Sequence, residues 1–511
     1  MTKVRAALAG MTAALVAVGL AELVAVPFGA RSAPLVAVGG WVIDHVPPGV
    51  KDFAISVFGT HDKQALLVGM VLVLAAFAAL VGLAARVRLA FGLAGIGLFT
   101  LVGVAAALTR PGATAAWALP SLVGGIAAGV LLAYLVRQQQ RSAPVGSMTG
   151  AEQDIARERS RRLFLRTVGV AAAGGVVVGV LGRTIASRLG VAKARSEVTL
   201  PAPASPAPAL PSHVDPGYVT SNKDFYRIDT AFFAEPQIDP STWQLRIHGM
   251  VDREITVTYA DLLDMPMVER YITLACVSNE VGGDLIGNAK WLGVPVKGLL
   301  EKAGVHPDAD QVVQRSVDGW TCGSPTEALT DGRDALLAVG MNGEPLPVVH
   351  GFPVRMVVPG LYGYVSACKW LAELEVTTFA AFDAYWVPRG WSQQAVIKTE
   401  SRIDTPGDGK SRPAGQVTIA GVAWAQHRGI SKVELNVAPD GQPGQWHDAE
   451  LLDTVSSDTW RQWKLDWNFT PGTYQLTVRA TDATGQTQAE AEAPPAPDGA
   501  TGWHSTRLVI V

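Results

Sequence analysis

The feature that most constrains this chain is a set of apolar stretches, each long enough to cross a membrane as a helix. A hydrocarbon layer about 30 Å thick takes roughly 20 helical residues to span. A shorter run near 33–46 contains two adjacent glycines and is followed by two prolines, so we expect an interfacial or re-entrant piece there. We therefore predict a transmembrane region of about four helices over residues 1–136. The four stretches lie near 6–26, 65–85, 89–108 and 115–136.

Charge divides the chain into two parts of opposite sign. Up to residue 190 there are 17 basic and 7 acidic residues, and the rest holds 25 basic and 38 acidic residues. This division favours a membrane region followed by a water-soluble part. An acidic soluble part also argues against nucleic acid as a partner, because phosphate binding needs a positive surface.

A fifth apolar stretch, 163–182, follows the sequence Ser-Arg-Arg-Leu-Phe-Leu-Arg at 160–166. This segment resembles a twin-arginine export signal, which is a receptor-read address rather than an anchor. The alternative is a basic flank that stops transfer. We expect 137–162 to be a cytoplasmic basic linker, 163–182 to be a fifth transmembrane or twin-arginine-like segment, and the segment to be retained.

The distribution of basic residues predicts the orientation in the membrane. Arginines and lysines precede the first span, lie between the second and third, and are concentrated in 137–162, all on one side if four spans are counted. The fifth span then delivers everything after residue 190 outside the cytoplasm, at the cell membrane. We expect 183–215 to be a Pro/Ala-rich spacer, stiff and extended.

Haem is not expected in this membrane part. The predicted spans contain none of the nine histidines, whereas a haem between helices normally needs a pair of them. We therefore expect an anchor or docking surface rather than an electron conduit.

The soluble part reads as two domains. Over 216–385, short strand-like runs alternate with Gly/Pro turns and a few helices, which predicts a mixed α+β domain. Over 386–511, alternating strands at 415–421, 430–437 and 472–480 predict an immunoglobulin-like β-sandwich. The whole chain is thus predicted to be multi-domain.

Cys276 lies where a predicted strand meets a loop. Ile272, Leu274 and Cys276 alternate along one strand face, and loop residues follow from 281. A thiolate at such a corner can be aimed at a ligand, although a buried structural cysteine is the commoner case. The chain has three cysteines, so at least one is unpaired within it.

The context of Cys276 resembles the sulfite oxidase family. The resemblance covers roughly 216–511 and implies molybdenum held by one molybdopterin dithiolene and by the thiolate of Cys276. It is carried by Cys-Val-Ser-Asn at 276–279, Leu-Ile-Gly-Asn-Ala-Lys-Trp-Leu-Gly-Val at 285–294, Met-Asn-Gly-Glu-Pro-Leu-Pro at 341–347, His-Gly-Phe-Pro-Val-Arg at 350–355, Val-Pro-Gly at 358–360 and Lys-Trp-Leu at 369–371.

The family's motif positions imply the cofactor contacts. A soft thiolate suits a metal already bound by sulfur. Around the pterin phosphate, Arg355 would fork onto the oxygens, Lys369 would add a compact charge, and His350 would donate from its ring. The remaining implied contacts are Tyr226 and Asn279. An ordinary structural or surface charge is the alternative at each basic position.

Substrate-facing residues are also implied, with two departures from the family. Arg227, in Asp-Phe-Tyr-Arg at 224–227, matches an arginine that faces the substrate oxyanion, and Arg461 is a second candidate. A surface salt bridge is the alternative for each arginine. Glu280 and Val281 stand where sulfite oxidases carry arginine, and Trp320 stands at the expected place of an active-site tyrosine. An indole lacks the hydroxyl needed for proton exchange, so sulfite as the substrate is put in question.

The resemblance implies two-electron oxygen-atom transfer on a sulfur or nitrogen oxy-compound. Electrons would pass to a separate carrier, such as a cytochrome or a quinone-linked protein. The C-terminal domain resembles the family's dimerisation domain, so a homodimer is one expectation. One alternative is a sulfoxide reductase of the protein-methionine-sulfoxide type. Another, from a different class, is a non-catalytic surface binding protein.

Overall fold

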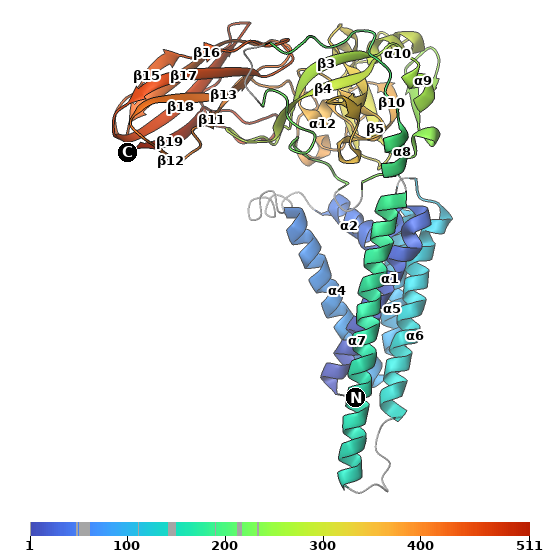
Figure 1. The fold of residues 1–511 in the computed structure, drawn as a ribbon. Helices are drawn as coiled ribbons and strands as arrows, with labels where there is room; N and C mark the ends of the chain where they lie inside the picture. The colour runs from blue at the N-terminus through green and yellow to red at the C-terminus, as the bar shows by residue number, and fades with distance from the viewer. Residues whose placement is uncertain are drawn as a thin grey trace. The chain divides into compact units, whose positions relative to one another are not determined.

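The computed structural model describes residues 2–46, 50, 62–110, 112–141, 150–189, 191–211, 217–231 and 235–511. The chain separates into two compact units (Figure 1). The first comprises Met1–Lys193 with Asp229–Gln237, and the second comprises Ala194–Ile228 with Ile238–Val511.

The first unit is helical. Five of its described helices are long and apolar enough to cross a membrane, over Lys3–Phe28, Ala65–Val87, Leu89–Leu108, Ala115–Gln140 and Glu158–Ile185. Each corresponds to a stretch predicted from the sequence. The run near 33–46 is a helix of only 12 residues, α2, too short to span. The main helices are α1 (Lys3–Ala25), α2 (Pro34–His45), α4 (Asp62–Val87), α5 (Leu89–Leu108), α6 (Leu119–Arg141) and α7 (Gly150–Leu189).

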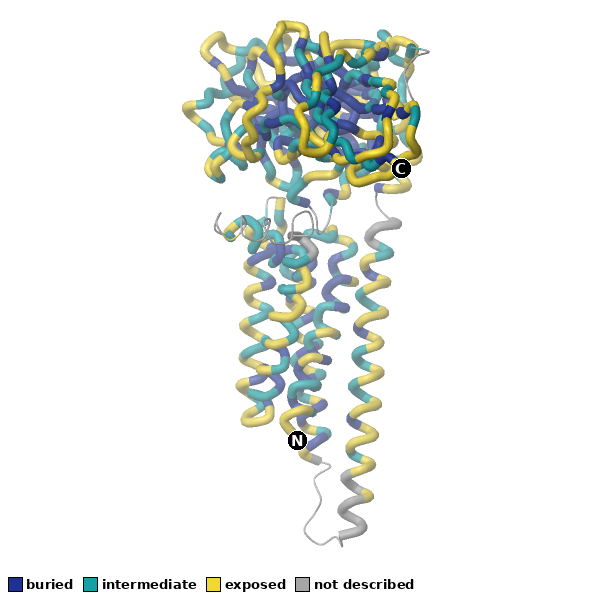
Figure 2. The backbone as a smooth tube through the Cα atoms, turned by 90° about the vertical axis from the view of Figure 1, so that its left-hand side faces the viewer, coloured by how far each residue is buried: buried dark blue, intermediate teal, exposed yellow. Residues whose placement is uncertain are grey.

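Helix α1 is the central helix of this unit, since small residues let its neighbours approach to backbone contact. A Cβ atom built at Gly10 would lie 2.0 Å from the carbonyl oxygen of Ala78 in α4. One at Gly19 would lie 2.0 Å from the carbonyl oxygen of Gly175 in α7. Close approach at small residues is the usual way in which helices pack in lipid. Figure 2 shows buried and exposed positions alternating along the helices of this unit.

The expected linker and spacer are more structured than the sequence predicts. Helix α6 continues to Arg141 and α7 begins at Gly150, so the twin-arginine-like segment lies inside a 40-residue helix. Residues 142–149 and 212–216 lie outside the described residues. Beyond α7, residues 191–197 form α8 (Val191–Glu197), and only 198–211 is extended.

The extended segment 198–211 forms backbone hydrogen bonds with residues of the second unit. The backbone N–H of Ala204 donates to Met267 at 2.8 Å, and the carbonyl of Ser205 accepts from Glu269 at 2.8 Å. These two residues lie between prolines, where Ala204 still offers the N–H that proline lacks. In α8, Arg195 forms an ion pair with Glu344 at 2.9 Å. Residues 194–211 therefore belong structurally to the second unit.

The second unit begins with the predicted α+β domain, built on two sheets. One has the order β2-β1-β10-β5-β6, in which only β1 and β10 are parallel, and the other has the order β3-β4-β7-β8, with β9 also paired to β7. Bounds are β1 (Gln244–Gly249), β2 (Ile255–Thr258), α9 (Tyr259–Leu263), β3 (Val268–Ala275), β4 (Ile286–Pro295), α10 (Val296–Ala303), β5 (Gln311–Ser316), β6 (Thr321–Pro325), α11 (Thr326–Thr330), β7 (Leu336–Met341), β8 (Glu344–Pro345), β9 (Arg355–Val357), α12 (Gly363–Ser366) and β10 (Leu371–Thr377).

The C-terminal domain consists of two sheets that share one core. Their orders are β11-β13-β17-β16 and β12-β19-β18-β14-β15. Ile419 from the first sheet packs in one cluster with Leu435 and Val478 from the second. The immunoglobulin-like class itself stays a prediction. Bounds are β11 (Glu400–Thr405), β12 (Lys410–Arg412), β13 (Gly415–Trp424), β14 (Ile430–Pro439), β15 (Gln445–Asp448), β16 (Glu450–Leu451), β17 (Arg461–Phe469), β18 (Gly472–Asp482) and β19 (His504–Ile510).

Hydrogen bonds and buried side chains also join the α+β domain to the C-terminal domain. The indole of Trp460 donates to the carbonyl of Tyr218 at 2.9 Å, and its backbone N–H donates to the hydroxyl of Thr273 at 2.8 Å. Ala395 and Ile397, placed by the sequence in the C-terminal domain, are buried in the core of the α+β domain. The same cluster also contains Val422, Trp424 and Trp460 of the C-terminal domain, so the two domains share this core, and the predicted boundary at residue 386 stays a prediction.

Candidate active site

Cys276 follows directly after strand β3, at the strand-to-loop corner predicted from the sequence. Its backbone N–H donates to Leu285 at 2.9 Å, and its carbonyl accepts from the N–H of Asn279 at 3.1 Å. The side-chain oxygen of Asn279 accepts from the N–H of Leu285 at 2.8 Å. These bonds close the loop and fix the position of the thiol, which is buried with 8% of the residue exposed.

The same loop leaves one polar group unsatisfied. Asn279 is 4% exposed, and its side-chain nitrogen Nδ2 has no hydrogen-bond partner among the described residues. A buried donor without an acceptor costs about 1–3 kcal/mol. An unpaired buried donor beside Cys276 indicates a binding site for a group that accepts hydrogen bonds.

Two tyrosines lie within the electrostatic range of the Cys276 thiol. Burial raises the pKa of the Tyr226 phenol above its ordinary value, and the neighbouring Cys276 raises it further. Burial also raises the pKa of Tyr362, with added contributions from Glu400 and, more weakly, Cys276. Both phenols therefore stay protonated at neutral pH and can donate hydrogen bonds. Tyr226 was predicted, whereas Tyr362 was missed.

Arg355 is a buried cation with neutral partners. It is 5% exposed, and its guanidinium donates to the carbonyls of His350 at 3.1 Å, Met356 at 3.4 Å and Ala367 at 3.5 Å. Among the described residues no carboxylate forms an ion pair with it. Its guanidinium carbon lies 5.0 Å from the ring centre of Trp291. Burial lowers the pKa of Arg355 to about 10, so the group remains charged at neutral pH.

His350 is held neutral beside this cation. Burial lowers the pKa of His350 to about 4, and the charges of Arg355, Lys369 and Arg227 act in the same direction. Its Nε2 lies 3.0 Å from the carbonyl oxygen of Asn222. Since a carbonyl only accepts, Nε2 carries the proton and Nδ1 is left as an acceptor. In this structure the ring N–H is therefore engaged by Asn222, and the donation from the ring to a phosphate stays a prediction.

The side chain of Lys369 contacts the backbone next to His350, on the same side as Arg355. Its Nζ donates to the carbonyl of Val349 at 3.2 Å, and the residue is 9% exposed. Gly351 lies between the two chain segments with φ of +110°, and a Cβ there would approach the Cβ atoms of Arg355 and Lys369 to 3.0 and 3.1 Å. Glycine at 351 therefore lets these side chains converge.

Aromatic rings fix the N-terminal side of the site. The ring of Phe225 stacks on Tyr226 with centroids 5.2 Å apart. Its centroid lies 5.6 Å from that of His350 and 5.8 Å from that of Trp291, in edge contacts. The segment 225–226 is thereby positioned between the buried histidine and the sheet, and the exposed Arg227 follows it.

The described interactions do not join two predicted residues, Trp320 and Arg461, to Cys276. Trp320 is half-buried in the turn between β5 and β6, where its carbonyl accepts from Ser316 at 2.9 Å. The guanidinium of Arg461 donates to the carbonyls of Leu452 at 3.0 Å and Ile430 at 2.9 Å, inside the C-terminal domain. Their substrate roles stay predictions.

Glu400 is a buried acid that the sequence did not single out. It is 5% exposed, and its Oε1 has no hydrogen-bond partner among the described residues. Burial raises the pKa of Glu400 to about 8, while Lys398 lowers it. In the sequence nothing distinguishes Glu400 from a surface carboxylate at the start of a strand.

We predict that Glu400→Gln stabilises the chain at high pH only. Between pH 4.5 and about 8 the unfolded chain releases a proton that the folded chain retains, so wild-type stability falls as pH rises through this range. Glutamine mimics the protonated acid. We expect a gain of about 2–4 kcal/mol at pH 8.5 and little at pH 5, measured by thermal unfolding. The exposed Glu301→Gln serves as the control, and an equal gain at both pH values would contradict the interpretation.

The family model "Oxidoreductase molybdopterin binding domain" matches residues 232–386. Mitochondrial sulfite oxidase of Mus musculus is 29% identical over 340 residues, covering 57% of this chain and 60% of that protein. The uncharacterized oxidoreductase YuiH of Bacillus subtilis (strain 168) is 36% identical over 139 residues, covering 27% of this chain and 67% of that protein.

A solved structure is also similar. The sulfane dehydrogenase SoxCD from Paracoccus pantotrophus aligns with a TM-score of 0.48 and 23% identity, covering 58% of this chain and 81% of that chain. The present chain spans about 60% of the length of the mouse sulfite oxidase that it matches.

Proposed function

The chain belongs to the sulfite oxidase family of molybdopterin-dependent oxidoreductases, and from this premise we propose that Cys276 is the protein ligand of its molybdenum. The observation that carries the proposal is the convergence of the Cys276 loop with buried cations and buried donors. A metal–thiolate bond would also keep the sulfur deprotonated.

The donor set suits an anionic pterin. Arg355 is charged and buried with only neutral carbonyls as acceptors, and the Nδ2 of Asn279 has no acceptor among the described residues. Phosphate oxygens would provide both with partners, and a guanidinium binds phosphate in a bidentate manner. Lys369 adds a second positive charge on the same side, next to Arg355.

In the proposed reaction the residues of this chain orient the cofactor and donate hydrogen bonds to the substrate. When bound, the molybdenum cofactor supplies two-electron oxygen-atom transfer. The hydrogen-bonded loop of Cys276 fixes the metal ligand, and the protonated phenols of Tyr226 and Tyr362 offer hydrogen bonds to an oxy-substrate. The neutral ring of His350 supports the segment that carries Arg355.

We propose a sulfur or nitrogen oxy-compound as substrate, with Arg227 facing it and with Arg461 as the second candidate for this role. One observation favours a neutral sulfoxide over sulfite. The loop that holds Cys276 carries two exposed carboxylates, Glu280 and Asp284, which would repel an anion. Assays in both directions, with artificial electron donors and acceptors, separate oxidation of sulfite from reduction of a sulfoxide.

The test of the proposal is metal analysis joined to turnover. From a cofactor-competent host, the purified full chain is expected to contain about one molybdenum per chain and to catalyse one of the two reactions. Protein that is folded but lacks molybdenum would refute the proposal and favour the surface binding protein considered from the sequence.

We propose further that the catalytic part lies outside the cytoplasm, tethered by the helices of the first unit and supplied by a separate electron carrier. The charge distribution flanking the apolar helices supports this orientation. A reporter enzyme that is active only outside the cytoplasm, fused after residue 197, is expected to be active. The immunoglobulin-like class of the C-terminal domain and a homodimer through it remain part of the proposal.

A further inference from the structure

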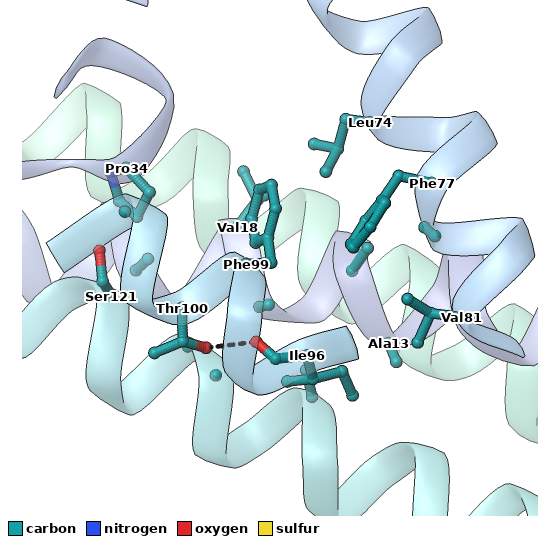
Figure 3. A pocket seen from close by; sticks show the side chains of 18 of the residues that line it. Ala13, Val18, Pro34, Leu74, Phe77, Val81, Ile96, Phe99, Thr100 and Ser121 are labelled. Atoms are coloured by element: carbon teal, nitrogen blue, oxygen red, sulfur yellow. Dashed lines mark hydrogen bonds between the residues drawn. The ribbon is translucent and has the colours of Figure 1, made fainter. Parts of the chain in front are cut away.

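The apolar cavity of the first unit, between helices α1, α4, α5 and α6, is small (Figure 3). Its volume is about 50 Å³, and side chains such as Phe77 and Phe99 line it. Small-molecule sites usually measure about 300–1,000 Å³. The cavity is therefore too small for such a ligand and reflects incomplete packing between the helices.

The loop that follows Cys276, in the second unit, is contacted by side chains of the C-terminal domain. Arg402, in strand β11, donates from its Nη1 to the carbonyl of Gly283 at 2.6 Å. His504, at the start of β19, packs on Gly282, where an added Cβ would lie 2.2 Å from the ring atom Cδ2. Gly282 also has φ of +77°, so glycine meets both the backbone conformation and the space that the ring leaves.

Both of these side chains are fixed within their own domain. The Nε of Arg402 donates to the carboxylate of Asp404 at 2.6 Å, and the arginine side chain is only 16% exposed. The Nδ1 of His504 accepts from the backbone N–H of Ile403 at 3.0 Å. Burial and the charge of Arg402 lower the pKa of His504, so the ring is neutral at neutral pH and its proton lies on Nε2. Arg402 and His504 are therefore held in place against the loop.

The strand that precedes Cys276 is held by the same domain. In β3, the backbone N–H of Thr273 donates to the carbonyl of Asp458 at 2.9 Å. The carbonyl of Thr273 accepts from the Nε2 of Gln426 at 3.1 Å. Cys276 therefore lies between two segments that the C-terminal domain holds.

Short contacts connect the turn at Gly283 to the cysteine. The N–H of Gly283 donates to the carbonyl of Glu280 at 2.8 Å, and the N–H of Asn279 donates to the carbonyl of Cys276 at 3.1 Å. A Cβ at Gly283 would lie 2.7 Å from the Oδ1 of Asn279. The carbonyl that Arg402 binds and the buried amide of Asn279 therefore belong to one tight turn, and a shift of Gly283 displaces Asn279.

We propose that Arg402 and His504 are positioning residues of the active site. From the C-terminal domain they hold the turn at 282–283, and this turn fixes the thiol of Cys276 and the side-chain amide of Asn279. The inference rests on the proposed function, since it gives a purpose to the order of this loop. It makes the C-terminal domain a part of the active site.

The first test uses the full chain purified without cofactor, from a host that makes no molybdopterin. Arg402→Met removes the donor to Gly283. It is expected to speed amide hydrogen exchange in residues 276–285 about tenfold or more, the effect of one lost charge-assisted hydrogen bond. Alkylation of Cys276 by iodoacetamide should accelerate similarly, whereas Cys322 and Cys368, with 0% exposure, should stay protected. Both readouts are made by mass spectrometry.

Arg428→Met is the matched control. Arg428 is likewise a half-buried arginine of the C-terminal domain, paired with Asp482 at 2.9 Å and donating to the carbonyl of Ile397 at 2.9 Å. It is expected to leave exchange in 276–285 as in the wild type. An equal acceleration in Arg428→Met and Arg402→Met would show general loss of stability and would overturn the inference.

His504→Asn tests the second contact without removing the acceptor for Ile403, because the asparagine oxygen replaces Nδ1. Space then opens beside Gly282, and exchange in 276–285 is expected to rise about threefold through lost packing. Unchanged exchange in both His504→Asn and Arg402→Met would also overturn the inference.

The loaded enzyme gives a further readout, with sulfite or dimethyl sulfoxide as substrate, whichever the wild type converts. Arg402→Met is expected to lower kcat about 10- to 100-fold with KM unchanged, and Arg402→Lys, which keeps a donor, should recover part of the loss. A raised KM at unchanged kcat would contradict the positioning role.

Exchange is measured without molybdenum, so the two proposals can fail separately. Loosening of the loop in the Arg402 and His504 variants of a chain that never binds molybdenum would leave the positioning contacts standing while the proposed function fails. Full molybdenum content and turnover, with no loosening in either variant, would do the reverse.

Discussion

Replacing Cys276 by serine is expected to lower turnover by about 10³-fold or more. Loss of an outer partner of a metal ligand typically costs 10- to 100-fold, and removal of the ligand itself should exceed that. The backbone hydrogen bonds that form the corner involve Leu285 and Asn279 and do not use the sulfur, so the fold should persist. Steady-state turnover and thermal unfolding of the same preparation measure the two effects.

Cys322→Ser provides the matched control. Cys322 is fully buried in the core of the same domain and, like Cys276, is not part of a disulfide. It is expected to retain molybdenum and turnover, with a modest loss of stability from a hydroxyl in an apolar site. Comparable losses of turnover in both variants would show that Cys276 acts only as a core residue.

Arg355→Met is expected to lower the affinity for the pterin cofactor by roughly 10²- to 10⁴-fold. Two charge-assisted hydrogen bonds to a phosphate contribute about 3–6 kcal/mol together. The stability of the cofactor-free chain should stay the same or rise. The acceptors of the guanidinium are neutral carbonyls, so its burial carries a desolvation penalty that no charged partner offsets. A methionine side chain at this position would not carry that penalty. Molybdenum and pterin content, and the melting temperature of cofactor-free protein, give the two readouts.

A surface arginine separates this effect from the general loss of a positive charge. Arg246 pairs with Glu254 at 2.8 Å on the outside of the same domain. Arg246→Met should keep its full cofactor content. If Arg355→Met kept its cofactor but melted well below the wild type when cofactor-free, Arg355 would be a structural residue.

The sequence predicts the local features of the site because these depend on short-range patterns. Strand β3 ends at Ala275, one residue before the end predicted at Cys276, and its last four residues are all buried rather than alternating in burial. Helix α9 begins at Tyr259, where Thr258 and Asp261 form a capping box, a short-range pattern of the kind that a sequence shows. The five apolar stretches likewise depend only on length and composition.

Contacts between distant segments escape sequence reasoning. Tyr362 follows the Val-Pro-Gly motif, but nothing in that spacing shows that its phenol lies near Cys276. Glu400 starts a strand of the next domain, and its burial follows from how the two domains pack. The hydrogen bond from His350 to Asn222 also joins residues 128 positions apart and sets the tautomer. Such relations arise from tertiary packing, which local propensity does not encode.

X-ray absorption at the molybdenum edge of the purified full chain tests the central claim most directly. Comparison of the wild type with Cys276→Ser is expected to show one fewer sulfur neighbour around the metal in the variant, with oxygen or nitrogen in its place. An identical sulfur shell in the two proteins, both loaded with molybdenum, would contradict the assignment of Cys276 as the protein ligand.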